Sequence, residues 1–126
     1  MSTVPVVRWT ATGAGVVVAF SAATHGKCAT AEHFDAAIEC RAALRSAHEF
    51  RKPMWDAVLK IDAFERPAEF DAALEDLDRN TYEVTLSPAA FRWLKVALAE
   101  QVVSGAFAAS RKRLTESLAA ALEGTA

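Results

Sequence analysis

The side chains that could carry metal or thiol chemistry are few in this 126-residue chain, which has two cysteines and three histidines. His25 and Cys28 have the spacing of one half of a zinc-binding knuckle, but the other half is missing. His33, Cys40 and His48 recur near the apolar side of one predicted helix, where packed imidazoles and a small thiol are the ordinary interpretation. The sequence therefore predicts no metal site, no cofactor and no catalytic residue.

A Gly-x-Gly pair, Gly13 and Gly15, would bring backbone N–H groups near a phosphate if it opened a helix. The flanking residues 4–11 and 16–20 are rich in β-branched and aromatic side chains, which predicts two strands joined by a turn. On this interpretation the glycines form the turn of a β-hairpin. The apolar run 16–23 is also compatible with a buried helix.

Acidic charge is concentrated in one part of the chain. Residues 61–83 carry eight acidic and two basic side chains, a local net charge of −6, whereas the whole chain carries −2. Asp71, Glu75 and Asp78 fall at i, i+4 and i+7 of a predicted helix and should point from one side into water. Grouped carboxylates favour encounter with a cationic partner. We predict a partner-binding surface formed by Asp62, Glu65, Glu69, Asp71, Glu75, Asp76 and Asp78.

The preferred functional hypothesis is a small non-enzymatic binding protein that neutralises a basic protein, as an immunity protein or antitoxin covers a nuclease-like toxin. A surface that binds nucleic acid is cationic, so its inhibitor gains from facing it with carboxylates. A plain solvated helix face would explain the same residues. An enzyme with a site of scattered polar residues is a further alternative, and self-association is left open.

Residues 106–114 contain a basic run that suggests a competing hypothesis, a DNA-binding regulator. The stretch Leu98-Ala99-Glu100-Gln101, followed by Ser104 and Ser110-Arg111, resembles the helix-turn-helix of lac-repressor-like regulators. The resemblance departs at the turn, where Val102-Val103 stand near the places of a small residue and a glycine. A helical hairpin with a basic end explains these residues without DNA, and the nearly neutral chain argues against a nucleic-acid partner.

The elements that position these residues follow from hydrophobic periodicity. Alternation of Tyr82, Val84 and Leu86 with polar residues predicts a strand over about 82–86. Helical spacing, with Thr30, Ser87 and three prolines marking helix starts, predicts helices over 31–50, from Pro53, from Pro67, from Pro88 and from about 107. Their expected core residues include Phe34, Cys40, Leu44, Leu74 and Leu94.

The predicted fold class is α+β, in which an N-terminal β-hairpin and the third strand form a small antiparallel or mixed sheet packed against about five helices. A composition of 52% hydrophobic and 24% charged residues is that of a globular protein, and the length suits one domain over residues 1–126. Two cysteines are too few for a disulfide framework, which predicts free thiols and a cytoplasmic location. No apolar run approaches the length of a membrane span.

Overall fold

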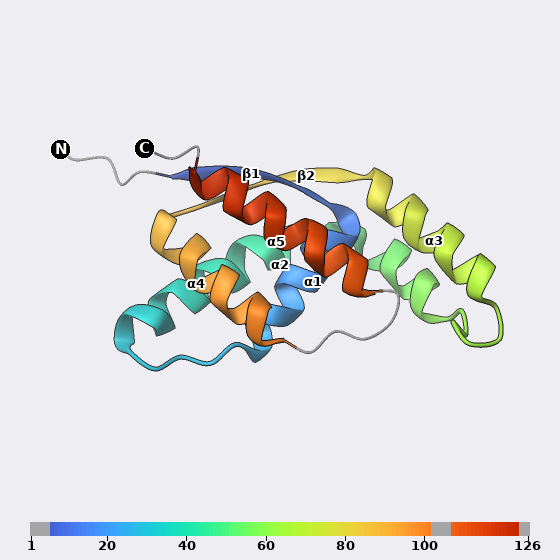
Figure 1. Ribbon diagram of the computed structural model, residues 1–126, viewed down its shortest axis with the longest axis horizontal. Helices are drawn as coiled ribbons and strands as arrows, with labels where there is room; N and C mark the ends of the chain where they lie inside the picture. The colour runs from blue at the N-terminus through green and yellow to red at the C-terminus, as the bar shows by residue number, and fades with distance from the viewer. Residues whose placement is uncertain (1–5, 102–106, 124–126) are drawn as a thin grey trace.

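The computed structural model describes residues 6–101 and 107–123. Over these residues the chain forms two strands and five helices, in the order β1, α1, α2, α3, β2, α4, α5 (Figure 1). The α+β class is thereby confirmed. The bounds of the elements are β1 Val7–Thr12, α1 Gly13–His25, α2 Ala31–Leu59, α3 Pro67–Arg79, β2 Thr81–Leu86, α4 Pro88–Glu100 and α5 Phe107–Glu123.

The sheet consists of β1 and β2 alone among the described residues, paired antiparallel with Trp9 opposite Val84. Side chains alternate along β1, so that Val7, Trp9 and Ala11 are buried while Arg8 and Thr10 are exposed. The strand predicted over about 82–86 is confirmed as β2. Segments from opposite halves of the chain therefore make the sheet.

The predicted N-terminal hairpin is wrong, because residues 16–20 belong to α1 and no third strand is seen in the described chain. Thr12 caps this helix, its Oγ1 accepting a hydrogen bond from the N–H of Gly15 at 3.0 Å. Residues 13–19 are all buried. A helix satisfies its own backbone hydrogen bonds, so one that is apolar all round can be enclosed by other elements. The run 16–23, which was compatible with a strand or a buried helix, is therefore helical.

Helix α2 is continuous, whereas the sequence predicted two helices separated before Pro53. A proline inside a helix removes one backbone hydrogen bond. The turns beyond it are held by packing, because Val58 is buried and Trp55 packs beside it. The expected core position of Phe34 is also wrong: its side chain is 53% exposed, while Ala37, Cys40 and Leu44 on the same helix are buried.

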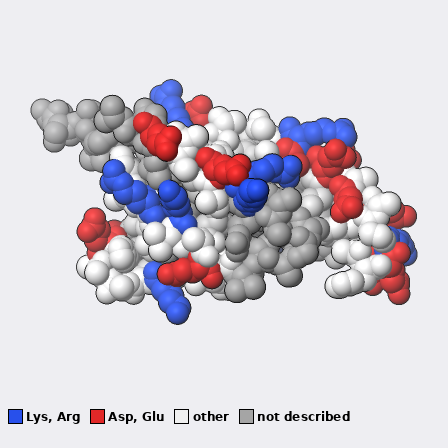
Figure 2. Space-filling view, in the orientation of Figure 1, with Lys and Arg blue, Asp and Glu red and all other residues white. Residues whose placement is uncertain are grey.

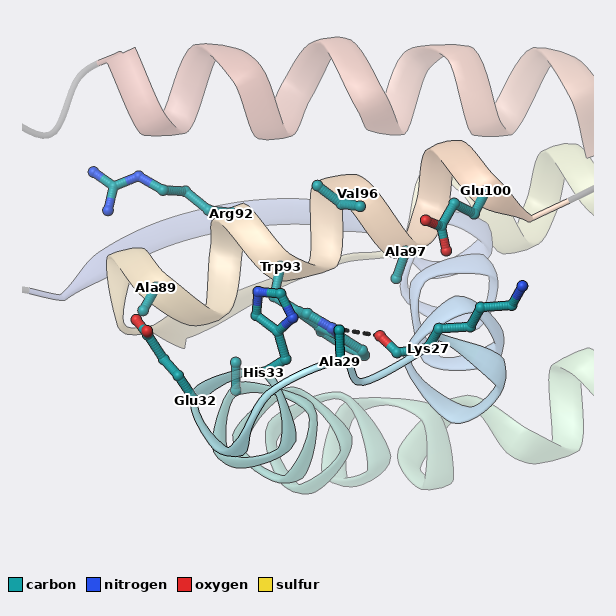
Figure 3. A pocket seen from close by; sticks show the side chains of 11 residues that line it. Lys27, Ala29, Glu32, His33, Ala89, Arg92, Trp93, Val96, Ala97 and Glu100 are labelled. Carbon is teal, nitrogen blue, oxygen red and sulfur yellow. Dashed lines mark hydrogen bonds between the residues drawn. The ribbon is translucent and has the colours of Figure 1, made fainter.

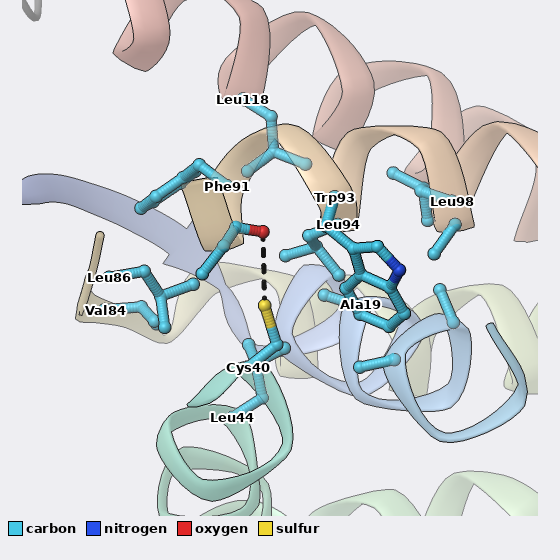
Figure 4. Close-up of a cluster of buried hydrophobic side chains, with 14 of the residues drawn as sticks. Ala19, Cys40, Leu44, Val84, Leu86, Phe91, Trp93, Leu94, Leu98 and Leu118 are labelled. Atoms are coloured by element: carbon cyan, nitrogen blue, oxygen red, sulfur yellow. Dashed lines mark hydrogen bonds between the residues drawn. The ribbon is translucent and has the colours of Figure 1, made fainter. Parts of the chain in front are cut away.

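Two hydrophobic clusters organise the molecule. The main cluster lies between the inner face of the sheet, α1, α4, α5 and the first half of α2, and includes Trp9. Other members are Leu44, Phe91, Leu94, Leu98 and Leu118 (Figure 4). The second cluster is smaller and lies under α3, where it consists of Ala14, Val58, Phe70, Leu74 and Leu77. The predicted burial of Leu94 and Leu74 is confirmed, one in each cluster.

Specific contacts lock the main cluster. Trp9 meets Phe91 edge-on with ring centroids 5.9 Å apart, and its Nε1 donates to Ser117 Oγ at 2.7 Å. The Cys40 thiol donates to the Ala90 carbonyl oxygen at 3.3 Å (Figure 4). Burial raises the pKa of Cys40 to about 12, so this thiol remains neutral and acts as a packing group.

Candidate functional site

Helix α3 and the turn before it, residues 60–66, form what we term the acidic end of the molecule. Pro67 opens the helix, and Phe70, Leu74 and Leu77 follow at helical spacing. These three side chains pack against Val58 of α2 and Ala14 of α1. Because one stripe is buried in this way, the acidic residues of the helix lie at its edges and outer side.

Gly13 joins the acidic end to the rest of the fold. Its N–H donates to the carbonyl oxygen of Asn80, and a Cβ at this position would overlap the backbone oxygen of Leu77. Glycine is therefore needed here for close approach of α1 to α3. The Gly-x-Gly pair does open a helix, contrary to the predicted turn, but the N–H groups of Gly13 and Gly15 are already bonded and their backbone is buried.

The turn before α3 is held by Asp62. Its Oδ1 accepts hydrogen bonds from the backbone N–H groups of Phe64, at 2.9 Å, and Glu65, at 3.2 Å. The Asp62 carbonyl oxygen also accepts from the N–H of Arg66 at 2.8 Å. This turn presents Phe64 with 98% of its surface exposed. An aromatic ring is thus displayed on a hydrogen-bonded turn beside carboxylates.

Six of the seven predicted binding residues are exposed, namely Asp62, Glu65, Glu69, Asp71, Glu75 and Asp76. Two of them form ion pairs within the acidic end, Glu69 with Arg66 at 3.6 Å and Asp76 with Arg79 at 3.3 Å. Pairs this exposed contribute little to stability and exchange readily for other partners. Figure 2 shows carboxylates gathered at this end of the molecule, with basic side chains among them.

Asp78 differs from the other six and corrects the expectation that it points to water. Only 20% of its side chain is exposed, and its Oδ2 accepts a hydrogen bond from Nη2 of Arg113 on α5 at 2.9 Å. Its other oxygen, Oδ1, is buried with no hydrogen-bond partner among the described residues. Asp78 therefore joins α3 to α5, and the accessible acidic surface consists of the remaining six carboxylates.

The basic run of the alternative DNA-binding hypothesis lies partly outside the described side chains. Residues 102–106 and the side chain of Arg111 are not described, Lys112 is exposed, and Arg113 binds Asp78. Helices α4 and α5 lie side by side and run in roughly opposite directions (Figure 1). That arrangement is a helical hairpin, whereas helix-turn-helix motifs cross their two helices steeply.

A cavity of about 490 Å³ lies between α2, α4 and the loop after α1. Small side chains and Trp93 line its floor, and Trp93 Nε1 donates to the Lys27 carbonyl oxygen at 3.2 Å. Figure 3 shows the charged ends of Arg92 and Lys27 directed away from each other, towards opposite ends of the cavity. Its polar groups do not converge on one point, as those of a catalytic site do.

The thiol and imidazole groups that the sequence offers as candidate metal ligands do not form one cluster. Cys28 is exposed and Cys40 is buried, both as free thiols, and the described residues contain no cluster of three or more metal-binding side chains. His33 lies on the cavity wall, exposed, and not on the apolar side of its helix. The His48 ring stacks on Phe20 with centroids 4.9 Å apart.

Comparison of the chain with protein-family models, with curated proteins and with solved structures finds no match. Among the described helices, none combines the length and apolar composition that crossing a membrane requires.

Phe64 was not among the predicted binding residues. A signal was present, since this large apolar residue stands between Asp62 and Glu65 and shortly before Pro67, outside any periodic stripe. Such a residue has no place in the helix pattern and therefore no predicted partner in the core. Its full exposure makes it the side chain of the acidic end with the most apolar surface to bury on binding.

Proposed function

We propose that this chain is a small cytoplasmic protein-binding module that neutralises a basic partner protein through its acidic end, in the manner of an immunity protein or antitoxin. The observation that carries the proposal is the exposed Phe64 ring on the turn held by Asp62, beside accessible carboxylates. The partner surface that fits is cationic, with an apolar pocket for one aromatic ring. A nuclease-like toxin has the cationic part of that surface where it binds nucleic acid.

The two components of the acidic end have different physical roles in this proposal. Carboxylates at the rim, such as Asp71 and Glu75, accelerate encounter and exclude acidic competitors. Phe64 supplies apolar area at the centre, where aromatic anchors dominate binding energy. The hydrogen bonds of Asp62 support binding because they fix the backbone of the turn before the partner arrives, which lowers the entropy lost on association.

The test is affinity capture from native lysate with a matched set of baits. One bait is the wild-type chain, the second carries Phe64→Ala, and the third carries Asp71→Lys with Glu75→Lys. The controls are Val96→Ala, another exposed apolar side chain, and Glu32→Lys with Glu100→Lys, another pair of exposed carboxylates. We expect a basic protein that the wild type and both controls retain and that both acidic-end variants lose.

Binding kinetics with the purified partner then separate the two roles. The double charge reversal should slow association and flatten its salt dependence. Phe64→Ala should mainly raise the dissociation rate, by tenfold or more on the scale of about 2 kcal/mol that interface anchors contribute. If both acidic-end variants bind the captured protein with unchanged rates across a salt series, the proposal is wrong and the carboxylates are solvated surface.

A further inference from the structure

A groove of about 450 Å³ runs between the second half of α1 and the middle of α2, away from the acidic end. Apolar side chains and two arginines line it. The residues concerned are Phe20 and Thr24 from α1 and Ile38, Arg41, Ala42 and Arg45 from α2. Ile38 is 49% exposed, and Phe34, one turn before it on α2, is 53% exposed. The groove is thus an apolar channel with cationic side chains along its wall.

The charges of the groove are available to a ligand. The Nε–H group of Arg41 donates a hydrogen bond to the Ala37 carbonyl oxygen at 3.3 Å, which leaves the two terminal nitrogens of the guanidinium for other contacts. Arg45 pairs with Glu49 at 3.3 Å, with more than half of each side chain exposed. Such a pair is weak and can open for a better-placed carboxylate. The groove therefore suits an apolar side chain flanked by acidic groups.

We infer that the occupant of this groove is the turn of a second copy of the chain, with Phe64 inserted beside Phe20 and Ile38 and its neighbouring carboxylates facing Arg41 and Arg45. The turn has both properties that the groove requires, a fully exposed aromatic ring and negative charge on either side. Opposite charges on two surfaces of one chain steer copies together in this orientation. The contact uses the turn of the proposed function but does not depend on the existence of a basic partner.

The contact has to be between molecules. Ile38 lies in the first half of α2, whereas the turn follows the end of that helix at Leu59. Roughly twenty residues of helix separate them, a distance of about 30 Å at the rise of an α-helix. A chain cannot place its own Phe64 in its own groove. Figure 1 shows α2 extending from the loop after α1 to the acidic end.

The same geometry pairs unlike surfaces, the groove of one copy with the turn of another. Two grooves facing each other would bring arginines together, and two acidic ends would bring carboxylates together, so symmetric pairing on either surface is disfavoured. A copy whose groove binds the next copy's turn can place its own turn in that same partner, which closes a two-fold dimer, or in a third copy, which extends a ring or a short chain.

The experiment measures the weight-average mass of the purified protein by sedimentation equilibrium over a concentration series at low and high salt. We expect the mass to rise above that of the monomer with concentration, and to fall as salt screens the arginine-carboxylate contacts. Phe64→Ala, and separately Ile38→Ser with Arg45→Glu, should each lower the association constant at least tenfold, since each removes the apolar contact at the centre of the interface.

Mixing the two variants gives the decisive measurement. The Phe64→Ala chain keeps an intact groove and the Ile38→Ser, Arg45→Glu chain keeps an intact turn, so an equimolar mixture should form a heterodimer that stops at two chains. The matched control is Val96→Ser with Lys95→Glu on α4, which likewise replaces an aliphatic side chain by serine and a basic one by glutamate at exposed positions elsewhere, and should associate like the wild type. Circular dichroism spectra establish that each variant is folded.

Three outcomes overturn the inference: a wild type that stays monomeric at every concentration, a groove variant that associates as the wild type does, or variants that fail to complement each other. The groove variant also separates this inference from the proposed function. It should still capture the basic partner through its intact turn, so loss of self-association with retained capture supports both ideas. Retained self-association of the groove variant contradicts the inference. Loss of capture by the same variant contradicts the proposed function, because its turn is intact.

Discussion

The two hydrophobic clusters differ in size and in what they support. The main cluster has members from both strands and four helices, and these include the buried side chains of Trp9, Trp93 and Phe91. The cluster under α3 has five buried members, and a large share of its packing comes from half-buried residues such as Trp55 and Met54. The chain thus places its candidate recognition surface on the region with the smaller core. Stability is expected to be unequal between the two regions, with local opening easier at the acidic end.

The largest expected effect is a difference in reactivity between the two thiols. Cys28 is exposed, whereas Cys40 lies in the main cluster with a pKa of about 12. Alkylation requires the thiolate, so Cys40 should react only when the region around the main cluster unfolds, at a rate about a thousandfold or more below that of Cys28. Peptide mass spectrometry during iodoacetamide labelling measures both rates, and in denaturant they should converge. Comparable native rates would mean that the main cluster also opens locally.

Truncation of one leucine in each cluster sharpens the comparison. Leu94 is fully buried in the main cluster, and Leu94→Ala should lower the free energy of unfolding by about 3–5 kcal/mol. Leu74 lies at the edge of the smaller cluster, and Leu74→Ala should lower the free energy of unfolding by about 2 kcal/mol. Urea denaturation gives both values, and hydrogen exchange should show faster opening of α3 alone in the Leu74→Ala protein. Uniformly faster exchange over the whole chain would show that the two regions unfold as one.

A smaller effect is expected from the contact that links the regions, between Asp78 and Arg113. Arg113→Ala leaves a mostly buried carboxylate without its ionic partner, which should cost about 1 kcal/mol because the arginine itself is largely exposed to solvent. The matched control is Arg79→Ala, which removes an exposed ion pair within the acidic end and should change stability by only a few tenths of a kcal/mol. A double-mutant cycle with Asp78→Asn measures the coupling. Equal costs for the two arginines would mean that the linking contact does not stabilise the fold.

The smallest effect is a dependence of stability on pH through His48. Burial, with a contribution from Lys52, lowers the pKa of His48 below its ordinary value of 6.5, so the fold favours the neutral ring stacked on Phe20. The unfolded chain then binds more protons in the window below pH 6.5, and the stability due to this group, fully present above that pH, is lost as pH falls through the lowered pKa. Denaturation midpoints between pH 5 and 8 should show this slope. His48→Gln should flatten it.

Much of the local structure was determined by the sequence itself. The stripe of Phe70, Leu74 and Leu77 specifies α3, and the Ser87-Pro88 pair specifies the start of α4, since the Ser87 hydroxyl accepts from the Ala90 N–H. Period-two alternation likewise specifies β2. These signals lie within each segment, so they predict its secondary structure without knowledge of its tertiary contacts. The exposure of the four carboxylates on α3, Glu69, Asp71, Glu75 and Asp76, follows from the same helix period together with their charge.

Only the tertiary structure decided the features that depend on partners distant in sequence. The valine run of α1 fits a strand or a helix equally well, and its enclosure on every side selects the helix. Packing on Val58 beyond Pro53 keeps α2 continuous, although a proline favours a break. Burial of Asp78 requires Arg113 from a helix near the other end of the chain. Exposure of Phe64 likewise follows from the tertiary arrangement, in which no described residue covers the turn, and no periodicity within its own segment encodes that.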